Sequence, residues 1–278
     1  ADARARRTRR GAPTVAVHSG DLDPDALPQT LRLLGVEPCV DAACVAVQDH
    51  GFHPDGSNRA FRFAFWERAV TDRRRLTDLF YERGDIPAEL TRLRAAADLA
   101  ADLAAGAPVL AADTGPAALL GALPDPAASR ASPTDAATTV LVNVGNGHVV
   151  CAVARAGRLA GVFEHHTTRL DGAALERRLR EFLAGRLTSA AVREDGGHGA
   201  GLAPDALMAL GTPVQAGGPS ADGLAPGLRI LVTGPRRDLL RRTALPLEFA
   251  APHGDMMLTG CYGLLRAARE RGIVGAPA

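Results

Sequence analysis

Hydrophobic residues in the first half of the chain form short continuous runs that alternate with stretches of helical period. The short runs, typical of strands covered on both faces, lie at residues 13–17, 44–48 and 109–112. Apolar residues at helical spacing occupy 28–34, 87–103 and 117–123. This half therefore predicts three strands, with helices between and after them.

The second half opens with three apolar runs joined by two tight turns. The runs lie at 138–142, 149–154 and 159–163, and their order predicts a β-meander. The later predicted elements are a helix at 170–183, a glycine-rich loop at 196–223, a strand at 228–232, and helices at 236–242 and 256–271. Because strands and helices alternate, we expect an α/β layer fold, doubly wound or related.

One aromatic-rich stretch, 61–70, contains the single tryptophan, Trp66. The neighbouring arginines, Arg59, Arg62 and Arg68, would suit stacking on nucleic-acid bases. A hydrophobic cluster beneath a loop is the interpretation that the sequence favours. Further along, Gly260 and Gly263 lie three residues apart in a predicted helix. They flatten one helix face, so another element or a second chain can lie close to it.

Composition limits the kinds of protein that this chain can be. It has 278 residues, 46% of them hydrophobic, which is enough for a substantial core in one large domain or two smaller ones. We place a lobe boundary in the Pro- and Ala-rich connector at 124–135, which divides the chain into 1–130 and 131–278. With 23% charged residues and a net charge of +1, neither nucleic acid nor a membrane is an expected partner.

Targeting and cysteine patterns are also informative. No apolar run reaches the length of a membrane span and no signal peptide is visible, so we expect a cytoplasmic protein. The four cysteines, Cys39, Cys44, Cys151 and Cys261, lack the close spacing that an iron–sulfur cluster requires. Reduced, mostly buried thiols are therefore expected.

The clearest local motif is the turn between the first two strands of the meander. It contains Asn143, Gly145, Asn146, Gly147 and His148. Two glycines in this short turn let backbone N–H groups point at one anion, as phosphate loops require. The asparagines would orient a phosphate or a metal-bound water, and His148 would donate to an oxygen. An Asn-Gly hairpin without a ligand fits the same residues.

Two strand-to-helix junctions form a second group of candidates. Asp113 ends a buried strand, where a carboxylate can bind Mg²⁺, act as a base or cap the next helix. The later junction consists of Thr233, Gly234, Pro235 and Arg236. In α/β sheets ligands collect at the carboxyl ends of strands, so Gly234 would let a flat group such as adenine approach closely.

Histidines and acidic residues form a third group. A metal site made of Asp49, His50, Glu164 and either His165 or His166 is one hypothesis. Adjacent histidines on a straight strand point to opposite faces, so both cannot bind one ion there. His198 belongs to the same group of histidines, for which polar loop positions without a ligand are the alternative.

Taken in order, the junctions at 113–123, 143–148, 233–236 and 255–265 resemble the actin/sugar-kinase/Hsp70 ATPase superfamily, which has a ribonuclease H-like, two-lobe architecture. More narrowly, the strings Asn-Val-Gly-Asn-Gly-His, Phe-Glu-His-His-Thr and Val-Thr-Gly-Pro-Arg-Arg resemble an uncharacterised prokaryotic family. Its members are often labelled pyruvate formate-lyase activating enzyme-like. The superfamily's first phosphate loop is absent here, so the front of the first lobe is expected to be missing.

The resemblance implies ATP and Mg²⁺ in a cleft between lobes, with Asp113 as Mg²⁺ ligand or base and an unknown phosphotransferase or ATPase substrate. Asn143 stands where the superfamily usually has aspartate, which makes a non-catalytic protein that binds a nucleotide or other phospholigand the alternative. A metal-dependent hydrolase built on the histidine group is a further one. Radical-enzyme activation comes last, because the cluster cysteines are absent.

Overall fold

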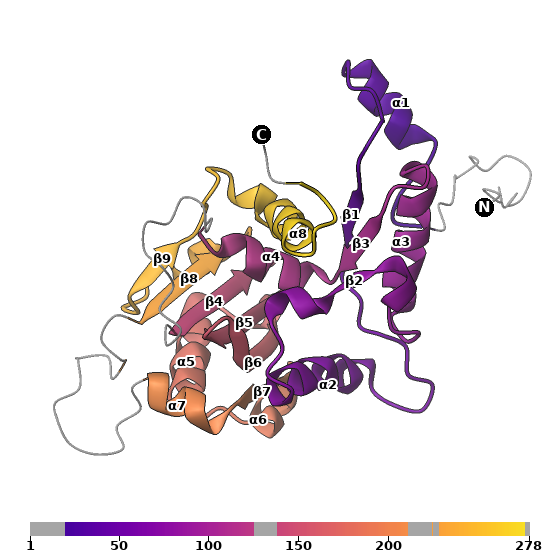
Figure 1. Cartoon of the computed structure of the whole chain (residues 1–278). Helices are drawn as coiled ribbons and strands as arrows, with labels where there is room; N and C mark the ends of the chain where they lie inside the picture. The colour runs from indigo at the N-terminus through magenta and orange to yellow at the C-terminus, as the bar shows by residue number, and fades with distance from the viewer. Residues whose placement is uncertain (1–19, 125–137, 211–223, 225–227, 276–278) are drawn as a thin grey trace, which may run out of the picture.

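The computed structural model describes residues 20–124, 138–210, 224 and 228–275. They form a mixed α/β structure with two sheets, so the predicted α/β class is confirmed (Figure 1). The smaller sheet has the order β1-β3-β2, from Ala43–Ala46, Val109–Ala112 and Phe80–Glu82. β1 and β3 run parallel, and β2 pairs with β3 in the antiparallel sense.

The larger sheet has six strands in the order β7-β6-β5-β4-β8-β9. They are β4 (Thr138–Val144), β5 (His148–Arg155), β6 (Arg158–His166), β7 (Gly199–Leu202), β8 (Arg229–Thr233) and β9 (Leu247–Phe249). The first three form the predicted meander, which β7 extends in the antiparallel sense. On the other side β8 and β9 run parallel to β4, so the sheet changes from antiparallel to parallel pairing at β4.

The described part of the chain contains eight α-helices, seven of which pack around these sheets, while α1 buries no residue and extends away from them (Figure 1). They are α1 (Ala26–Leu33), α2 (Asn58–Thr71), α3 (Thr91–Leu103), α4 (Thr114–Ala122), α5 (Gly172–Leu183), α6 (Ser189–Glu194), α7 (Pro204–Leu210) and α8 (Thr259–Glu270). α4 and α8 lie side by side between the two sheets (Figure 1). α5 covers the opposite face of the larger sheet, and α3 packs on the smaller one.

Alternation along β4 explains how the larger sheet is covered on both faces. Val140 and Val142 are fully buried in the core beside α5, whereas Leu141 is buried in the core beside α4 and α8. Successive side chains of a strand point to opposite faces, so a continuous apolar run is needed where both faces are covered.

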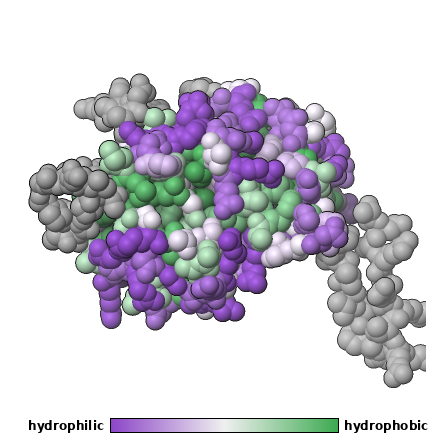
Figure 2. Space-filling view, turned by 90° about the horizontal axis from the view of Figure 1, so that it is seen from below, coloured by the Kyte–Doolittle hydropathy of each residue, from purple (hydrophilic) through white to green (hydrophobic). Residues whose placement is uncertain are grey.

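On the face seen in Figure 2, hydrophilic residues predominate toward the periphery and hydrophobic ones gather near the middle.

Glycines allow α4 and α8 to touch. A Cβ atom on Gly121 would lie 1.8 Å from the Thr259 carbonyl oxygen, and one on Gly263 would lie 1.9 Å from the Ala117 carbonyl oxygen. The predicted close approach is therefore confirmed for Gly263, and its partner is a helix of the same chain. A Cβ atom on Gly260 would meet no atom within 4 Å, so this residue faces open space instead.

Three predicted elements need correction. The aromatic stretch 61–70 belongs to α2, which begins after Ser57 and buries Phe63 and Trp66 on one face. Glycine-rich 196–223 is not a loop throughout, since it contains β7 and α7. Gly199 pairs with Glu164 of β6, and a Cβ atom there would lie 2.4 Å from the Phe63 ring, so the absence of a side chain leaves room for this ring. The helix predicted at 236–242 is a single 3-10 turn, Arg237–Leu240.

Other predictions lie outside the described residues or at their edge. The strand at 13–17 and most of the connector at 124–135, with the boundary at 130/131, fall in parts that the structure does not describe. Within the described ranges, no helix combines the length and the apolar character that a membrane span requires.

Candidate functional site

The predicted glycine junctions border one cavity of about 360 Å³. Most of its walls come from the turn between β4 and β5, the end of β8, the beginning of α4 and the beginning of α8, and Gln48 and Arg62 of α2 complete them. The lining includes Thr114, Gly115, Asn143, Gly145, Asn146, Gly147, His148, Thr233, Gly234, Pro235, Thr259 and Gly260. Seven of the eight residues predicted to bind a cofactor therefore face one space, although they come from two separate strand ends of the sequence.

The turn between β4 and β5 is held by backbone bonds. The Gly145 N–H donates to the His148 carbonyl at 2.9 Å. The Thr167 hydroxyl and N–H donate to the Gly145 and Gly147 carbonyls at 2.8 and 2.9 Å. A Cβ atom on Gly145 would lie 2.9 Å from the His148 oxygen, so the tight hairpin requires glycine there. Asn146 and Gly147 are exposed at the tip and border the cavity.

Gly234 brings the end of β8 against this turn. Its φ of +101° lies in the region that favours glycine. A Cβ atom there would lie 2.4 Å from the Val144 carbonyl oxygen. The Arg236 N–H donates to the same Val144 oxygen at 3.0 Å, while the Arg236 side chain does not line the cavity. The adjacent Pro235 is exposed and does line it.

A buried arginine connects the cavity to the neighbouring carboxylates. Arg62 of α2 is 5% exposed and donates to both oxygens of Asp113, at 2.6 and 3.0 Å. It also donates to Glu164 at 2.8 Å and to the Asp49 carbonyl at 2.6 Å. Burial alone would lower the pKa of Arg62, but the two carboxylates outweigh it and raise this pKa.

Asp113 is occupied by structural contacts. Besides Arg62, it accepts from the N–H groups of Asp49 and Gly115, both at 2.9 Å, the latter as the N-cap of α4. Burial alone would raise the pKa of Asp113, but Arg62 and these N–H groups lower it below its usual value. The cap proposed from the sequence is therefore present. The role of Mg²⁺ ligand or base would require displacing contacts that already use both carboxylate oxygens.

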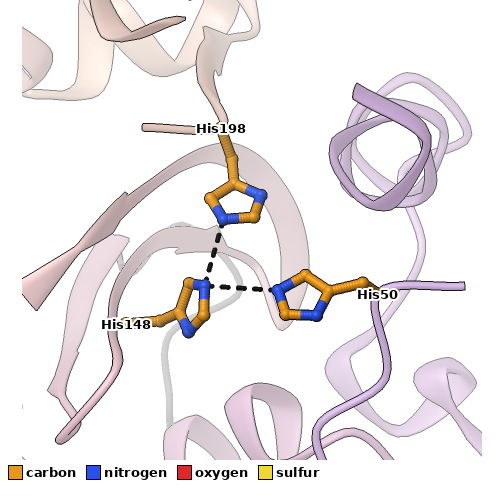
Figure 3. Close-up of side chains that lie close together, drawn as sticks. All are labelled: His50, His148 and His198. Atoms are coloured by element: carbon orange, nitrogen blue, oxygen red, sulfur yellow. Dashed lines mark hydrogen bonds between the residues drawn. The ribbon is translucent and has the colours of Figure 1, made fainter. Parts of the chain in front are cut away.

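Three histidines converge beside the cavity (Figure 3). His148 begins β5, His50 follows β1, and His198 directly precedes β7. The Nε2 atom of His148 lies 3.0 Å from that of His198 and 3.4 Å from that of His50. The ring of His166 lies near, with its centroid 4.5 Å from that of His148. Only the tertiary structure brings these residues together.

The electrostatic surroundings keep these imidazoles neutral. Burial, followed by the Arg62 charge, lowers the pKa of His148 to about 3. Burial, then the neighbouring His148 and the Arg62 charge, lowers the pKa of His198 to about 2. The pKa of His50 is lowered as well, chiefly by burial. A neutral imidazole carries a free lone pair on one ring nitrogen, which is the form that binds metal ions.

The metal set proposed from the sequence is not brought together as a group. Asp49 accepts from the N–H groups of Gly51 and Leu93, both at 2.8 Å, and so fixes the backbone. His165 points to the face of β6 opposite Glu164, where its Nε2 lies 3.4 Å from Asp195. Of the four, His50 belongs to the triad and Glu164 lies behind His198, with 3.7 Å between its Oε2 and the His198 Nδ1.

Sequence patterns did not assign a site role to Arg62 or Gln48. Arg62 is one of many arginines, and only its burial within α2 distinguishes it. Gln48 directly precedes Asp49-His50, and its side-chain amide contacts the Nδ1 of His148. The sequence includes His198 among the candidate histidines, but its glycine-rich surroundings predict a loop there and not the residue directly before a strand.

Comparison with known families places the chain in one of them. The family model described as "Putative pyruvate format-lyase activating enzyme (DUF1786)" matches residues 6–239. The chain belongs to this family. No curated protein matches the sequence. Among the described residues, the group of side chains suited to a metal ion consists of histidines, and none of the four cysteines belongs to it.

Proposed function

We propose that this protein binds a phosphorylated nucleotide, ATP or a close relative, in the cavity between the β4–β5 turn and the beginning of α8. The observation that carries the proposal is the convergence of three glycine-containing junctions on that one cavity. Its volume, about 360 Å³, lies in the range of small-molecule sites. The meander followed by a parallel strand, a glycine turn and a closing helix supports the actin-like assignment, in which ATP occupies this position.

The donors around the cavity fit phosphate. Asn143, Asn146 and Gly147 border the cavity and can offer it side-chain and backbone N–H groups. The Gly115 N–H at the beginning of α4 already donates to Asp113. Arg62 is the charged residue among those that line the cavity, and its guanidinium already bonds to Asp113, Glu164 and the Asp49 carbonyl. At the other side the Thr233 hydroxyl donates to the Thr259 hydroxyl at 3.2 Å, and the latter donates to the Met256 carbonyl at 2.6 Å, so the protons of both are in use. The cavity therefore offers a phosphate group amide and backbone donors of the glycine turn rather than an unpaired cation.

The same lining does not fit a protein-bound Mg²⁺. It contains no aspartate or glutamate among the described residues, and Asn143 stands at the position where a carboxylate would help to hold the ion. Mg²⁺ usually takes one or two carboxylates in addition to phosphate oxygens and water. We therefore favour nucleotide binding over hydrolysis.

Binding is tested by calorimetric titration of the metal-free chain with ATP, ADP and inorganic phosphate, followed by thermal unfolding at saturating ligand. A ligand at 100 times its Kd stabilises the folded state by about 2.7 kcal/mol. We expect saturable binding of ATP and, with added Mg²⁺, no phosphate release. The absence of both heat and thermal stabilisation at millimolar nucleotide would overturn the proposal. Rapid phosphate release would show that the protein is an ATPase and not a nucleotide-binding protein without turnover.

A further inference from the structure

We propose that His50, His148 and His198 form a site for one divalent transition-metal ion of the zinc class, at the edge of the phosphate cavity. The inference is independent of the proposed nucleotide and goes beyond it. It rests on the geometry of the three Nε2 atoms, on the groups behind the rings, and on the position of His148, which belongs to both the triad and the cavity lining.

The spacing of the nitrogens matches a tetrahedral centre. With Zn–N bonds of 2.0–2.1 Å, two ligand nitrogens of a tetrahedron are about 3.4 Å apart. His148 and His50 have this separation, 3.4 Å, and His148 and His198 are at 3.0 Å. The ligand atoms of all three residues lie within 4.8 Å of one another. A small adjustment of the His50 and His198 rings would therefore place the three nitrogens around one ion.

The far nitrogens of two rings face groups that would orient them. The Nδ1 of His198 lies 3.7 Å from Glu164 Oε2, and neither of these buried atoms has a hydrogen-bond partner. A slight approach would let Nδ1–H donate to Glu164, which fixes the tautomer that leaves Nε2 free for a metal. Metal-bound histidines usually have such a carboxylate, carbonyl or water behind them.

His148 has a corresponding partner. The side-chain amide of Gln48 contacts its Nδ1. An amide turned by 180° presents its oxygen instead of its NH₂, so Gln48 accepts from Nδ1–H when Nε2 binds a metal. Without a metal, the Nε2 atoms of His148 and His198, 3.0 Å apart, can share one proton in a hydrogen bond. The cluster is therefore compatible with an empty state and arranged for a cation.

One carboxylate oxygen behind the triad has no partner. Arg62 bonds to Asp113 and to Oε1 of Glu164, while the buried Oε2 of Glu164 has no hydrogen-bond partner. A metal ion on the Nε2 side of His198 would strengthen its Nδ1–H as a donor to this oxygen.

Imidazole ligands favour zinc, copper, iron or nickel over magnesium or calcium, which prefer oxygen ligands. Three protein ligands leave the fourth tetrahedral position of zinc open, which is the composition of catalytic rather than structural zinc sites. The ring of His166 lies next to the triad, with its centroid 4.8 Å from that of His198, but His166 is not one of the three proposed ligands. An oxygen of water or of a phosphate in the cavity is the expected fourth ligand.

The test is titration of chelator-treated, untagged full-length chain with ZnCl₂ in the calorimeter, without nucleotide. We expect one zinc ion per chain, and a loss of affinity of about tenfold or more in His50→Ala and in His148→Ala, since each removes a ligand. Exposed His53, three residues from His50, provides the matched control, and His53→Ala should bind zinc as the wild type does. Equal affinity in all three variants would overturn the proposal.

A second measurement uses the wild type alone, so that it does not depend on whether a variant folds. Zinc should protect His50 and His148, which are half-buried, from diethylpyrocarbonate, as read by mass spectrometry, while His53 reacts equally with and without the metal. Equal modification of His50 and His148 in both states would contradict the site. Because neither experiment contains nucleotide, they separate failure of the metal site from failure of the proposed nucleotide binding.

Discussion

Arg62 and Asp113, which are 51 positions apart, form a two-point ion pair of 2.6 and 3.0 Å next to the candidate site. The same guanidinium reaches Glu164 in the central meander, so one side chain joins α2, the beginning of α4 and β6. Planar arginine matches a carboxylate with two parallel hydrogen bonds, which lysine cannot do. The two sheets are thus connected by a buried polar link as well as by apolar packing.

Loss of this link should destabilise the fold strongly. Arg62→Met leaves Asp113 and Glu164 buried without their cation, and removal of one partner of a buried pair typically costs about 3–5 kcal/mol. Urea unfolding followed by circular dichroism measures the change. The matched control is Arg83→Met, whose partner Asp98 is exposed, and whose loss should cost less than about 1 kcal/mol. Similar values for both variants would show that the buried link has no special role.

The nucleotide cavity can be filled without disturbing its walls. Gly260 lines the cavity, and a Cβ atom there would meet nothing within 4 Å, so Gly260→Leu should fold and occupy ligand space. We expect nucleotide binding to weaken by about tenfold or more, the equivalent of about 1.4 kcal/mol. Calorimetric titration with ATP gives the result.

The control for cavity filling is Gly84→Leu. Gly84 also has open space at its Cβ position but lies in the turn Arg83–Asp85, away from the cavity lining. It should bind ATP as the wild type does. If Gly260→Leu binds ATP with unchanged affinity, the nucleotide does not occupy the cavity that we assign to it.

The two glycines of α8 should respond oppositely to alanine. In Gly263→Ala the new methyl group would collide with the Ala117 carbonyl of α4, and such overpacking typically costs about 1–3 kcal/mol. In Gly260→Ala it meets open space, and better helix propensity should stabilise by up to about 1 kcal/mol. The free energies of unfolding of both variants are compared with wild type. A destabilised Gly260→Ala with an unaffected Gly263→Ala would reverse the assignment of the two faces.

Thiol reactivity should follow burial. Cys39 and Cys261 are exposed, whereas Cys151 is fully buried in β5, and burial raises the pKa of its thiol well above the usual range. Because the thiolate is the reactive form, iodoacetamide at mildly alkaline pH should label Cys39 and Cys261 in the folded protein and leave Cys151 unlabelled. Peptide mass spectrometry identifies the labelled residues. Unfolding in urea should expose Cys151, and its rapid labelling in the native protein would contradict the packing of β5.

Local patterns predicted several elements because their signals are local. The run at 109–112 is β3 with the same bounds, and the three runs of the meander are β4, β5 and β6 within a few residues. The helix at 170–183 begins two residues later, at Gly172, after the cap Asp171. Each signal, a turn, a cap or a hydrophobic period, lies within about ten positions of the element that it specifies.

Position in the whole fold decided what local patterns could not. The sequence places Phe63 and Trp66 in a hydrophobic cluster beneath a loop. In the structure both are buried residues of α2, which packs against β6 and β7. The sequence places Gly199 in a glycine-rich loop. In the structure it belongs to β7, where the absence of a side chain leaves room for the Phe63 ring next to β6.

The sequence by itself determined the α/β class, the meander with its glycine turn, and the candidate residues Asn143 and Gly234, because turns and strand ends are encoded locally. The tertiary structure decided that these residues face one cavity, that Asp113 is held by Arg62, and that His198 meets His148 across fifty positions. Their convergence depends on strand order and on the side of the sheet to which each residue points. A one-position shift in register reverses that side, and local spacing does not specify it.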